Sequence, residues 1–192
     1  SDGLDKMLNM YFGKPDEFIV RKEIKDFIVY KVVTPFKPDI EYIRFKGTTT
    51  ISWSTVESSL SNNKERIKMI YKIIKREPDR RPMVLNKLQD CNKNLSAYLT
   101  KKNIDNELLI DKMKTWRKEA RVLVAGLKKA GVGFDDPTRN MLITMTSVKD
   151  VRQNEGRIRC ANNVIYDIVD DHSSLENHWS GTKKYMGREK WY

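Results

Sequence analysis

The sequence contains few of the residues that enzymes most often use for acid–base and redox chemistry. It has two histidines and two cysteines among 192 residues. Cys91 and Cys160 each stand alone, without a C-x-x-C partner, which is typical of free thiols buried in a reducing compartment. No Ser–His–Asp or Cys–His arrangement can be assigned. We therefore lean against an enzyme and predict no catalytic residue, metal site or cofactor.

Long apolar segments are also missing. No run of about 18 apolar residues occurs, so no segment is expected to span a membrane. Residues 1–13, SDGLDKMLNMYFG, lack the basic start and the apolar core of a secretory signal. The stretch 125–133, AGLKKAGVG, lacks the GK[ST] of a phosphate-binding loop, and a helix end followed by a turn explains it better. We expect an intracellular protein, cytoplasmic or nuclear, that is not secreted.

Positive charge is abundant, and it is concentrated in the middle of the chain. The formal net charge is +11. Residues 61–134 hold 19 basic and 8 acidic residues, whereas residues 1–60 and 135–192 each hold 9 of either sign. A local excess of this kind favours a polyanionic partner, although surface lysines also serve solubility alone.

The hydrophobic pattern predicts strands first and helices afterwards. Leu4, Met7, Leu8 and Tyr11 follow helical spacing near the start. Residues 17–53 are rich in β-branched and aromatic residues and are punctuated by prolines and a glycine, which predicts three or four partly antiparallel strands. From residue 54 onward, apolar residues recur every three or four positions. The predicted helices begin near Ser54, Ser61, Val84, Asp105, Asp136 and Ile158.

These patterns predict an α+β fold. A small, mostly antiparallel N-terminal sheet would pack on a bundle of four or five helices, followed by an extended C-terminal tail. The corresponding units are a helix and sheet over 1–53, a basic helical bundle over 54–170, and a polar and aromatic tail over 171–192.

Two basic helix faces are the principal candidate site. The longest periodic signal lies in the helix predicted over 105–131, where apolar residues from Leu109 to Leu127 alternate at spacings of four and three. Its cations would fall within a sector of about 60°. The residues predicted to contact nucleic acid on the two faces are Lys114, Arg117, Arg121 and Lys128 on this helix and Lys64, Lys68, Lys72 and Lys75 on the preceding one.

The C-terminal tail interleaves cations with aromatic residues. Lys183, Lys184, Arg188 and Trp191 are added to the candidate nucleic-acid contacts, because aromatic rings stack on unpaired bases while cations neutralise phosphates. The same composition suits an arm that docks on a protein partner, or on its own domain, through buried aromatic anchors.

Two weaker patterns point to metal chemistry, and we adopt neither. Glu23-Ile24-Lys25, with Asp16 upstream, faintly resembles the PD-(D/E)xK pattern of metal-dependent nucleases. An acidic cluster with both histidines spans 167–178, and carboxylates with imidazoles can hold transition metals. ExK triplets are frequent by chance in a lysine-rich chain, and no second ligand cluster accompanies the histidines.

The leading prediction is a non-enzymatic nucleic-acid-binding protein that contacts the phosphate backbone, such as a nucleoprotein or a replication, packaging or transcription accessory factor. The alternative is a structural or adaptor protein whose basic face and aromatic tail meet an acidic protein or an anionic membrane surface. A metal-dependent nuclease is the third reading. The choice between DNA and RNA, between single and double strands, and between monomer and homo-oligomer stays open.

Overall fold

The structure, a computed structural model, describes residues 27–61, 63–130, 134, 136–146, 162–183 and 188–191. Strands and helices are interspersed along the chain. In order they are β1 (Phe27–Val33), β2 (Tyr42–Phe45), β3 (Thr48–Ile51), α2 (Trp53–Ser61), α3 (Lys64–Arg76), β4 (Pro82–Asn86), α4 (Gln89–Lys101), β5 (Asn106–Leu109), β6 (Val122–Gly126), β7 (Met141–Thr144), β8 (Asn163–Val169), α6 (Ser173–Lys183) and β9 (Arg188–Trp191).

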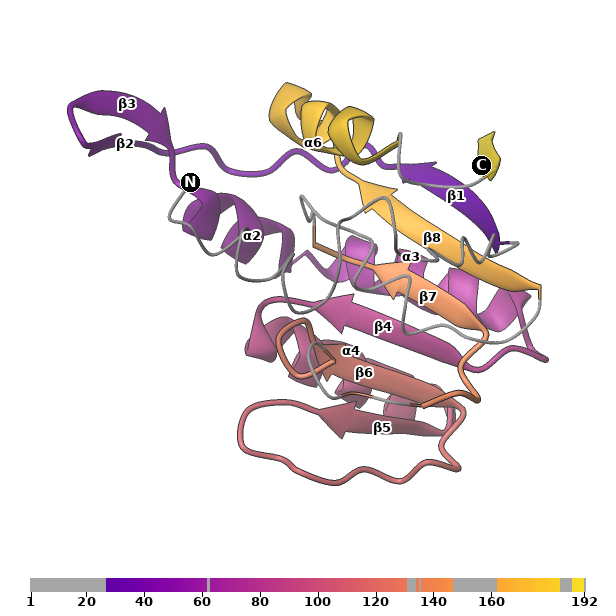
Figure 1. Ribbon diagram of the computed structural model, residues 1–192. Helices are drawn as coiled ribbons and strands as arrows, with labels where there is room; N and C mark the ends of the chain where they lie inside the picture. Colours follow the sequence, from indigo (N-terminus) through magenta and orange to yellow (C-terminus); the bar gives the residue numbers. More distant parts are fainter. Residues whose placement is uncertain are drawn as a thin grey trace, which may run out of the picture.

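One seven-stranded sheet organises the molecule. Its strand order is β5-β6-β4-β7-β8-β1-β9, and every pairing in it is parallel. β2 and β3 form a separate antiparallel pair. In Figure 1 this hairpin projects from the side of the molecule toward which the arrowheads of β4, β7 and β8 point. We call that side, where the parallel strands end, the carboxyl edge, and the opposite side the amino edge.

The sheet is covered on both faces. On one face, α3 and α4 pack against it through a core that includes Ile70, Ile74, Leu95 and Leu99, each fully buried; Figure 1 shows these two helices together on that face. The other face is covered by irregular segments, in which Trp116 stacks on Phe134 with ring centroids 5.1 Å apart. A parallel sheet requires such cover, because both of its faces are apolar.

The strands form where the sequence has short, continuous apolar runs. VLVAG in β6, MLIT in β7 and NVIYDIV in β8 are buried throughout, except for Gly126 at the end of β6. Side chains alternate between the two faces of a strand, so consecutive apolar residues fill both cores at once. Leu123 accordingly packs in one core, while Val122 and Val124 pack in the other.

The helix predicted over 105–131 is wrong. This segment contains β5, an irregular stretch, β6 and a turn. The helical spacing was a coincidence, because its apolar residues belong to different segments: Leu109 ends β5, Ala120 lies in the irregular stretch, and Leu123 lies in β6. Val122 and Val124, which the helical pattern left out, are fully buried as well, as a strand between two covered faces requires and an amphipathic helix does not.

The predicted α+β architecture with a helical bundle is therefore wrong, and the fold is α/β. Residues 136–146 and 162–170, expected in two helices, hold the central strands β7 and β8. Three predicted helices are confirmed, α2 near Ser54, α3 and α4, although Val84, where the last of these was expected to begin, lies in strand β4. In α3 the side-chain oxygen of Asn63 accepts hydrogen bonds from the backbone N–H groups of Glu65 and Arg66, which fixes the start of the helix.

The two ends of the described chain lie in the same sheet. β1 pairs with β8 on one side and with β9 on the other, so the sheet joins residues from both ends of the sequence. The tail over 171–192 is not a separate extended arm, because it contains helix α6 and strand β9, which pairs at the edge of the sheet. The helix predicted near Leu4 lies outside the described residues. Within the described ranges, no helix has the length and apolar character needed to cross a bilayer.

Candidate functional site

The carboxyl edge is where the topology places a ligand site. In parallel α/β sheets, ligands bind beyond the ends of the strands, at the point where neighbouring strands continue in opposite directions. β4 and β7 are such neighbours, because the chain leaves β4 toward β5 and β6 but leaves β7 toward β8. The backbone N–H of Lys87 donates to the Thr146 hydroxyl at 3.1 Å, which joins the two strand ends.

A buried ion pair fixes the carboxyl ends of three strands. Arg66 of α3 donates to both carboxylate oxygens of Asp170, at 3.1 Å and 3.0 Å, and to the carbonyl of Met145. Asp170 also accepts from the Thr34 hydroxyl at 2.7 Å. Both charged side chains are almost fully buried, at 1% and 3% exposure. The pair thus ties the ends of β1, β7 and β8 to α3, and a pocket lined by Glu57, among other residues, adjoins it.

A basic groove lies beside this pair, at the ends of β4, β5 and β6. It has a volume of about 410 Å³. We call it the carboxyl-edge groove; its lining residues are Lys87, Gln89, Asp111, Gly126, Leu127, Lys128 and Lys129. Lys128 is exposed, whereas Lys87 pairs with Glu57 at 2.8 Å and Lys129 donates to the Met113 carbonyl at 3.1 Å. Lys128 is therefore the lysine of this groove most open to a negatively charged ligand, because Lys87 and Lys129 already have partners within the protein.

Gly126, Leu127, Lys128 and Lys129, from the glycine-containing stretch 125–133, line this groove. The stretch begins inside strand β6, contrary to the prediction that it ends a helix, and residues 131–133 lie outside the described residues. The N–H groups of Lys129 and Ala130 both donate to the Gly126 carbonyl, at 2.8 Å and 3.0 Å, which turns the chain and leaves Lys128 at the surface. Recognition of VLVAG as a strand would have placed these lysines at a ligand edge.

The acidic cluster at 167–178 is engaged by neighbouring side chains. Asp167 accepts a hydrogen bond from Thr144, and Glu176 pairs with Lys31 at 2.5 Å. Complete burial raises the pKa of Asp167 to about 6, although the Thr144 hydrogen bond and the charge of Lys31 act against the rise. Among the described residues, no group of three or more histidine, cysteine or acidic side chains is placed to hold a metal ion. His178 instead stacks on Trp53.

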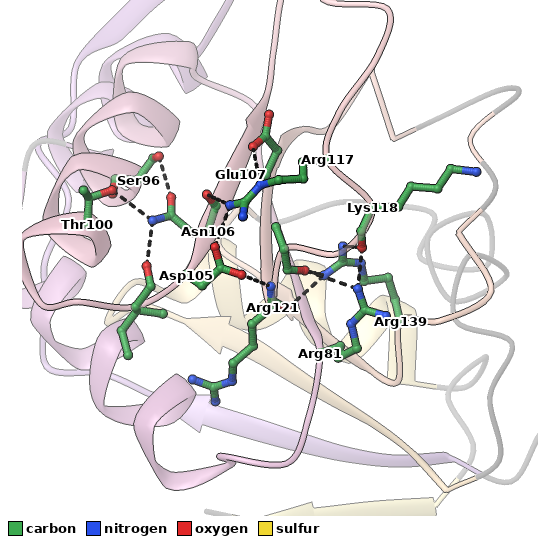
Figure 2. Close-up of polar contacts among 12 residues, drawn as sticks. Arg81, Ser96, Thr100, Asp105, Asn106, Glu107, Arg117, Lys118, Arg121 and Arg139 are labelled. Carbon is green, nitrogen blue, oxygen red and sulfur yellow. Dashed lines mark hydrogen bonds and ion pairs between the residues drawn. The ribbon is translucent and has the colours of Figure 1, made fainter.

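Two predicted nucleic-acid contacts, Arg117 and Arg121, lie at the amino edge (Figure 2). Arg117 pairs with Asp105 at 2.5 Å and with Glu107 at 3.6 Å. The guanidinium of Arg121 donates to two backbone carbonyls of the α3 end, each at 2.8 Å. The Arg117 hydrogen bond, helped by the backbone N–H of Arg121, holds the pKa of Asp105 below its usual value. These two arginines therefore bind the protein's own acids and carbonyls.

Arg139, which the sequence did not single out, completes this amino-edge network. It is fully buried, pairs with Asp136 at 2.8 Å and donates to the carbonyls of Ala120 and Arg121 at 3.0 Å and 2.9 Å. Burial alone would raise the pKa of Asp136, but hydrogen bonds from Thr138 and Arg139 outweigh it and lower that pKa. The network joins the chain segments that precede β6 and β7.

The other predicted contacts are scattered over the surface. Lys64 and Lys68 line a second groove of about 420 Å³ between α3 and α4, and Lys68 pairs with Glu65 at 2.5 Å. Lys72, Lys75 and Lys114 are exposed. Lys183 ends α6 and Arg188 and Trp191 lie in β9, while Lys184 lies outside the described residues, as do Asp16, Glu23, Lys25 and Cys160. The structure thus places Lys64, Lys68, Lys72 and Lys75 on the one helix α3, whereas Arg117, Arg121 and Lys128 lie in irregular segments before and after β6.

Comparison with known proteins identifies relatives along nearly the whole chain. No family model matches. The chain is 29% identical to "Putative helicase 161L" of Invertebrate iridescent virus 6 over 94% of its length, and 26% identical to "Putative helicase 055L" of Frog virus 3 (isolate Goorha) over 92%. It spans 45% and 41% of those two proteins. Over 80 residues it is 38% identical to uncharacterized protein 108L of Invertebrate iridescent virus 3 and covers 77% of that protein.

Two solved structures share this fold. The T4 protein UvsW matches 86% of this chain with a TM-score of 0.59 and 13% identity; the chain spans 41% of it. The E. coli DEAD-box protein SrmB, solved with the regulator RraA, matches 89% of this chain with a TM-score of 0.57 and 16% identity; the chain spans 91% of that structure. The fold is therefore the RecA-like fold of helicase domains.

These findings overturn the function predicted from the sequence. The prediction of a non-enzymatic binding protein, its adaptor and nuclease alternatives, and the leaning against an enzyme were wrong, because the relatives over more than nine-tenths of the chain are named as helicases. The scarcity of histidine misled, since phosphoryl transfer depends mainly on positioning and on charge stabilisation.

Proposed function

We propose that this chain, which belongs to the same family as protein 108L of Invertebrate iridescent virus 3, is one lobe of a nucleic-acid-dependent ATPase of the helicase class. The observation that carries the proposal is the agreement of two comparisons over the same residues. Proteins named as helicases align with 94% and 92% of the chain, and the structures of UvsW and of the DEAD-box protein SrmB match 86% and 89% of the chain.

In the proposed ATPase, this lobe is not the one whose P-loop holds the phosphates of the nucleotide. Such ATPases use a G-x-x-x-x-G-K-[ST] loop to cradle the phosphates, and the sequence contains no GK[ST]. The chain also spans less than half of the relatives named as helicases. We infer that the phosphate-binding loop belongs to a companion lobe, and that this lobe completes the ATPase across its carboxyl edge.

The carboxyl-edge groove is the proposed nucleic-acid contact. Lys128 is exposed there, and Lys87 and Lys129 line the same groove. Lysine binds phosphate as a point charge, so such contacts give affinity for any sequence and weaken as salt rises. The lysines of α3 form a second basic surface, on the helix that covers one face of the sheet and not at the carboxyl edge. They serve as the control surface for the groove.

Binding by charge-reversed variants tests this assignment. Affinity of the chain for a labelled single-stranded oligonucleotide is measured by fluorescence anisotropy at several salt concentrations. Lys128→Glu with Lys129→Glu is expected to weaken binding and to reduce the salt slope by about 1.4, roughly 0.7 for each single-strand phosphate that the chain no longer neutralises. The matched control is Lys72→Glu with Lys75→Glu on α3. A larger loss in the control than in the groove variant would contradict the proposed surface.

ATP hydrolysis tests the enzymatic part. The chain alone is expected to hydrolyse no ATP, because it has no P-loop. A polypeptide of the relatives' length that joins this lobe to a P-loop lobe is expected to hydrolyse ATP faster when single-stranded nucleic acid is added. The groove variant should reduce that stimulation while the α3 control retains it. Hydrolysis that is indifferent to nucleic acid would contradict the proposal.

A further inference from the structure

The β2–β3 hairpin exposes large apolar side chains beyond the body of the domain. Tyr42 is 68% exposed, Phe45 58% and Ile43 43%. Figure 1 shows the hairpin standing away from the sheet on the carboxyl-edge side. An isolated two-stranded hairpin gains little stability from burying apolar surface, so rings left exposed along it need another reason.

The hairpin has a defined shape and a fixed base. Lys46 and Gly47 have φ of 49° and 80°, the two positive values that a tight two-residue turn of type I′ requires. At the base, the N–H of Ser52 donates to the Glu41 carbonyl at 2.8 Å, and Ile51 packs in a small core with α2 and α6. The body therefore holds the base while the end is presented to solvent.

The hairpin combines aromatic rings with positive charge along its length. Residues 42–51, YIRFKGTTTI, contain Arg44 and Lys46 and no acidic residue. The register pairs Tyr42 with Ile51 and Arg44 with Thr49, so Tyr42 and Arg44 lie on one face, about 7 Å apart along the strand. Phe45 lies on the other face, with the Lys46 ammonium 5.5 Å from its ring centroid. Each face therefore places a cation beside a ring.

We propose that this hairpin is a stacking platform for unpaired bases of a nucleic acid. Tyr42 on one face and Phe45 on the other would each stack on a base, while Arg44 and Lys46 contact the adjacent phosphates, the combination by which proteins hold single strands without sequence preference. The inference rests on the proposed function, since it assigns a second contact to the strand bound in the carboxyl-edge groove. A strictly apolar partner would not require two cations within five residues, and a basic partner would be repelled by them.

Removal of the rings tests the platform. The full chain is titrated into fluorescein-labelled oligothymidylate and oligouridylate of 12 nucleotides, and into a duplex of the same length. Tyr42→Ser with Phe45→Ser is expected to weaken single-strand binding about tenfold or more, because neither ring remains to stack on a base, and to change duplex binding little. Ile43→Ser is the matched control, as it removes an exposed apolar side chain from the same strand without removing a ring.

The outcomes separate the two proposals. Loss of single-strand affinity in the double variant, with Ile43→Ser unchanged, supports the platform. Equal affinities for the double variant and the control overturn it and leave the groove as the only proposed contact. An unvaried chain that binds no oligonucleotide at any salt overturns the proposed function as well. Self-association that disappears in the double variant, measured by sedimentation, with unchanged single-strand affinity, would assign the rings to a contact between copies and also overturn the platform.

Discussion

The buried pair between Arg66 and Asp170 offers the strongest test of how the carboxyl edge is built. The substitution Asp170→Asn keeps the size of the side chain and removes its charge. Arg66 then stays buried, at 1% exposure, without the carboxylate that accepts two of its hydrogen bonds. An uncompensated buried charge costs about 3–5 kcal/mol, whereas whole domains have about 5–15 kcal/mol of stability.

The cost should not add when both partners are replaced. Arg66→Met removes the buried cation, so the second substitution, Asp170→Asn, no longer leaves an unpaired charge. We expect each single variant to lose about 3–5 kcal/mol and the double variant to lose clearly less than the two together. In the double variant the Met145 carbonyl loses its hydrogen bond from Arg66, and the side chain at position 170 loses both hydrogen bonds that Arg66 donated.

Urea unfolding followed by circular dichroism measures these free energies, and the four proteins form a double-mutant cycle. The control is Asp90→Asn, which removes an exposed carboxylate paired with Lys93 at 3.4 Å and should leave the unfolding midpoint unchanged. A cost below about 1 kcal/mol for Asp170→Asn, or strictly additive losses, would refute the argument that the pair holds the ends of β1, β7 and β8 together.

Two further predictions concern buried charges elsewhere. Burial raises the pKa of Asp167 from 3.8 to about 6. The unfolded chain therefore gives up this proton at lower pH than the folded chain, and the folded state loses about 3 kcal/mol of stability as the pH rises from 4 to 6. Asp167→Asn should remove that loss, so the stability of the variant relative to the unvaried chain should rise over this pH window, and a pH-independent difference in urea unfolding would contradict the assignment. Arg139→Met should cost about 3–5 kcal/mol of stability in urea unfolding, because it leaves the buried Asp136 carboxylate without its cation. A urea midpoint equal to that of Lys72→Gln, an exposed control, would count against this prediction.

The sequence predicted the helices better than the strands. Ile67, Ile70 and Ile74 mark one face of α3, and Cys91, Leu95 and Tyr98 mark one face of α4, because a surface helix buries one stripe and exposes the rest. β6, β7 and β8 are buried on both faces and carry no such contrast. Their apolar runs are short enough to fit a helical pattern, and each of the three was predicted to lie in a helix.

The candidate site was missed because it is a property of the topology. The residues of the carboxyl edge come from the ends of strands that are far apart in sequence, and Arg66 and Asp170 are 104 residues apart. Net charge did indicate a polyanion, but it could not show which cations are already engaged. Arg117 is bound by Asp105 and Glu107, whereas Lys128 is exposed at the groove. Charge counts do not distinguish these two residues.

Hydrogen–deuterium exchange, followed by mass spectrometry with and without a single-stranded oligonucleotide, tests the central claim most directly. The claim is that this lobe meets nucleic acid at its carboxyl edge. It predicts slower exchange at the backbone amides of Lys87–Leu88 and Leu127–Ala130, with α3 and the segment around Arg117 unchanged. Slower exchange confined to α3 or to the amino edge, or none at low salt, would contradict it.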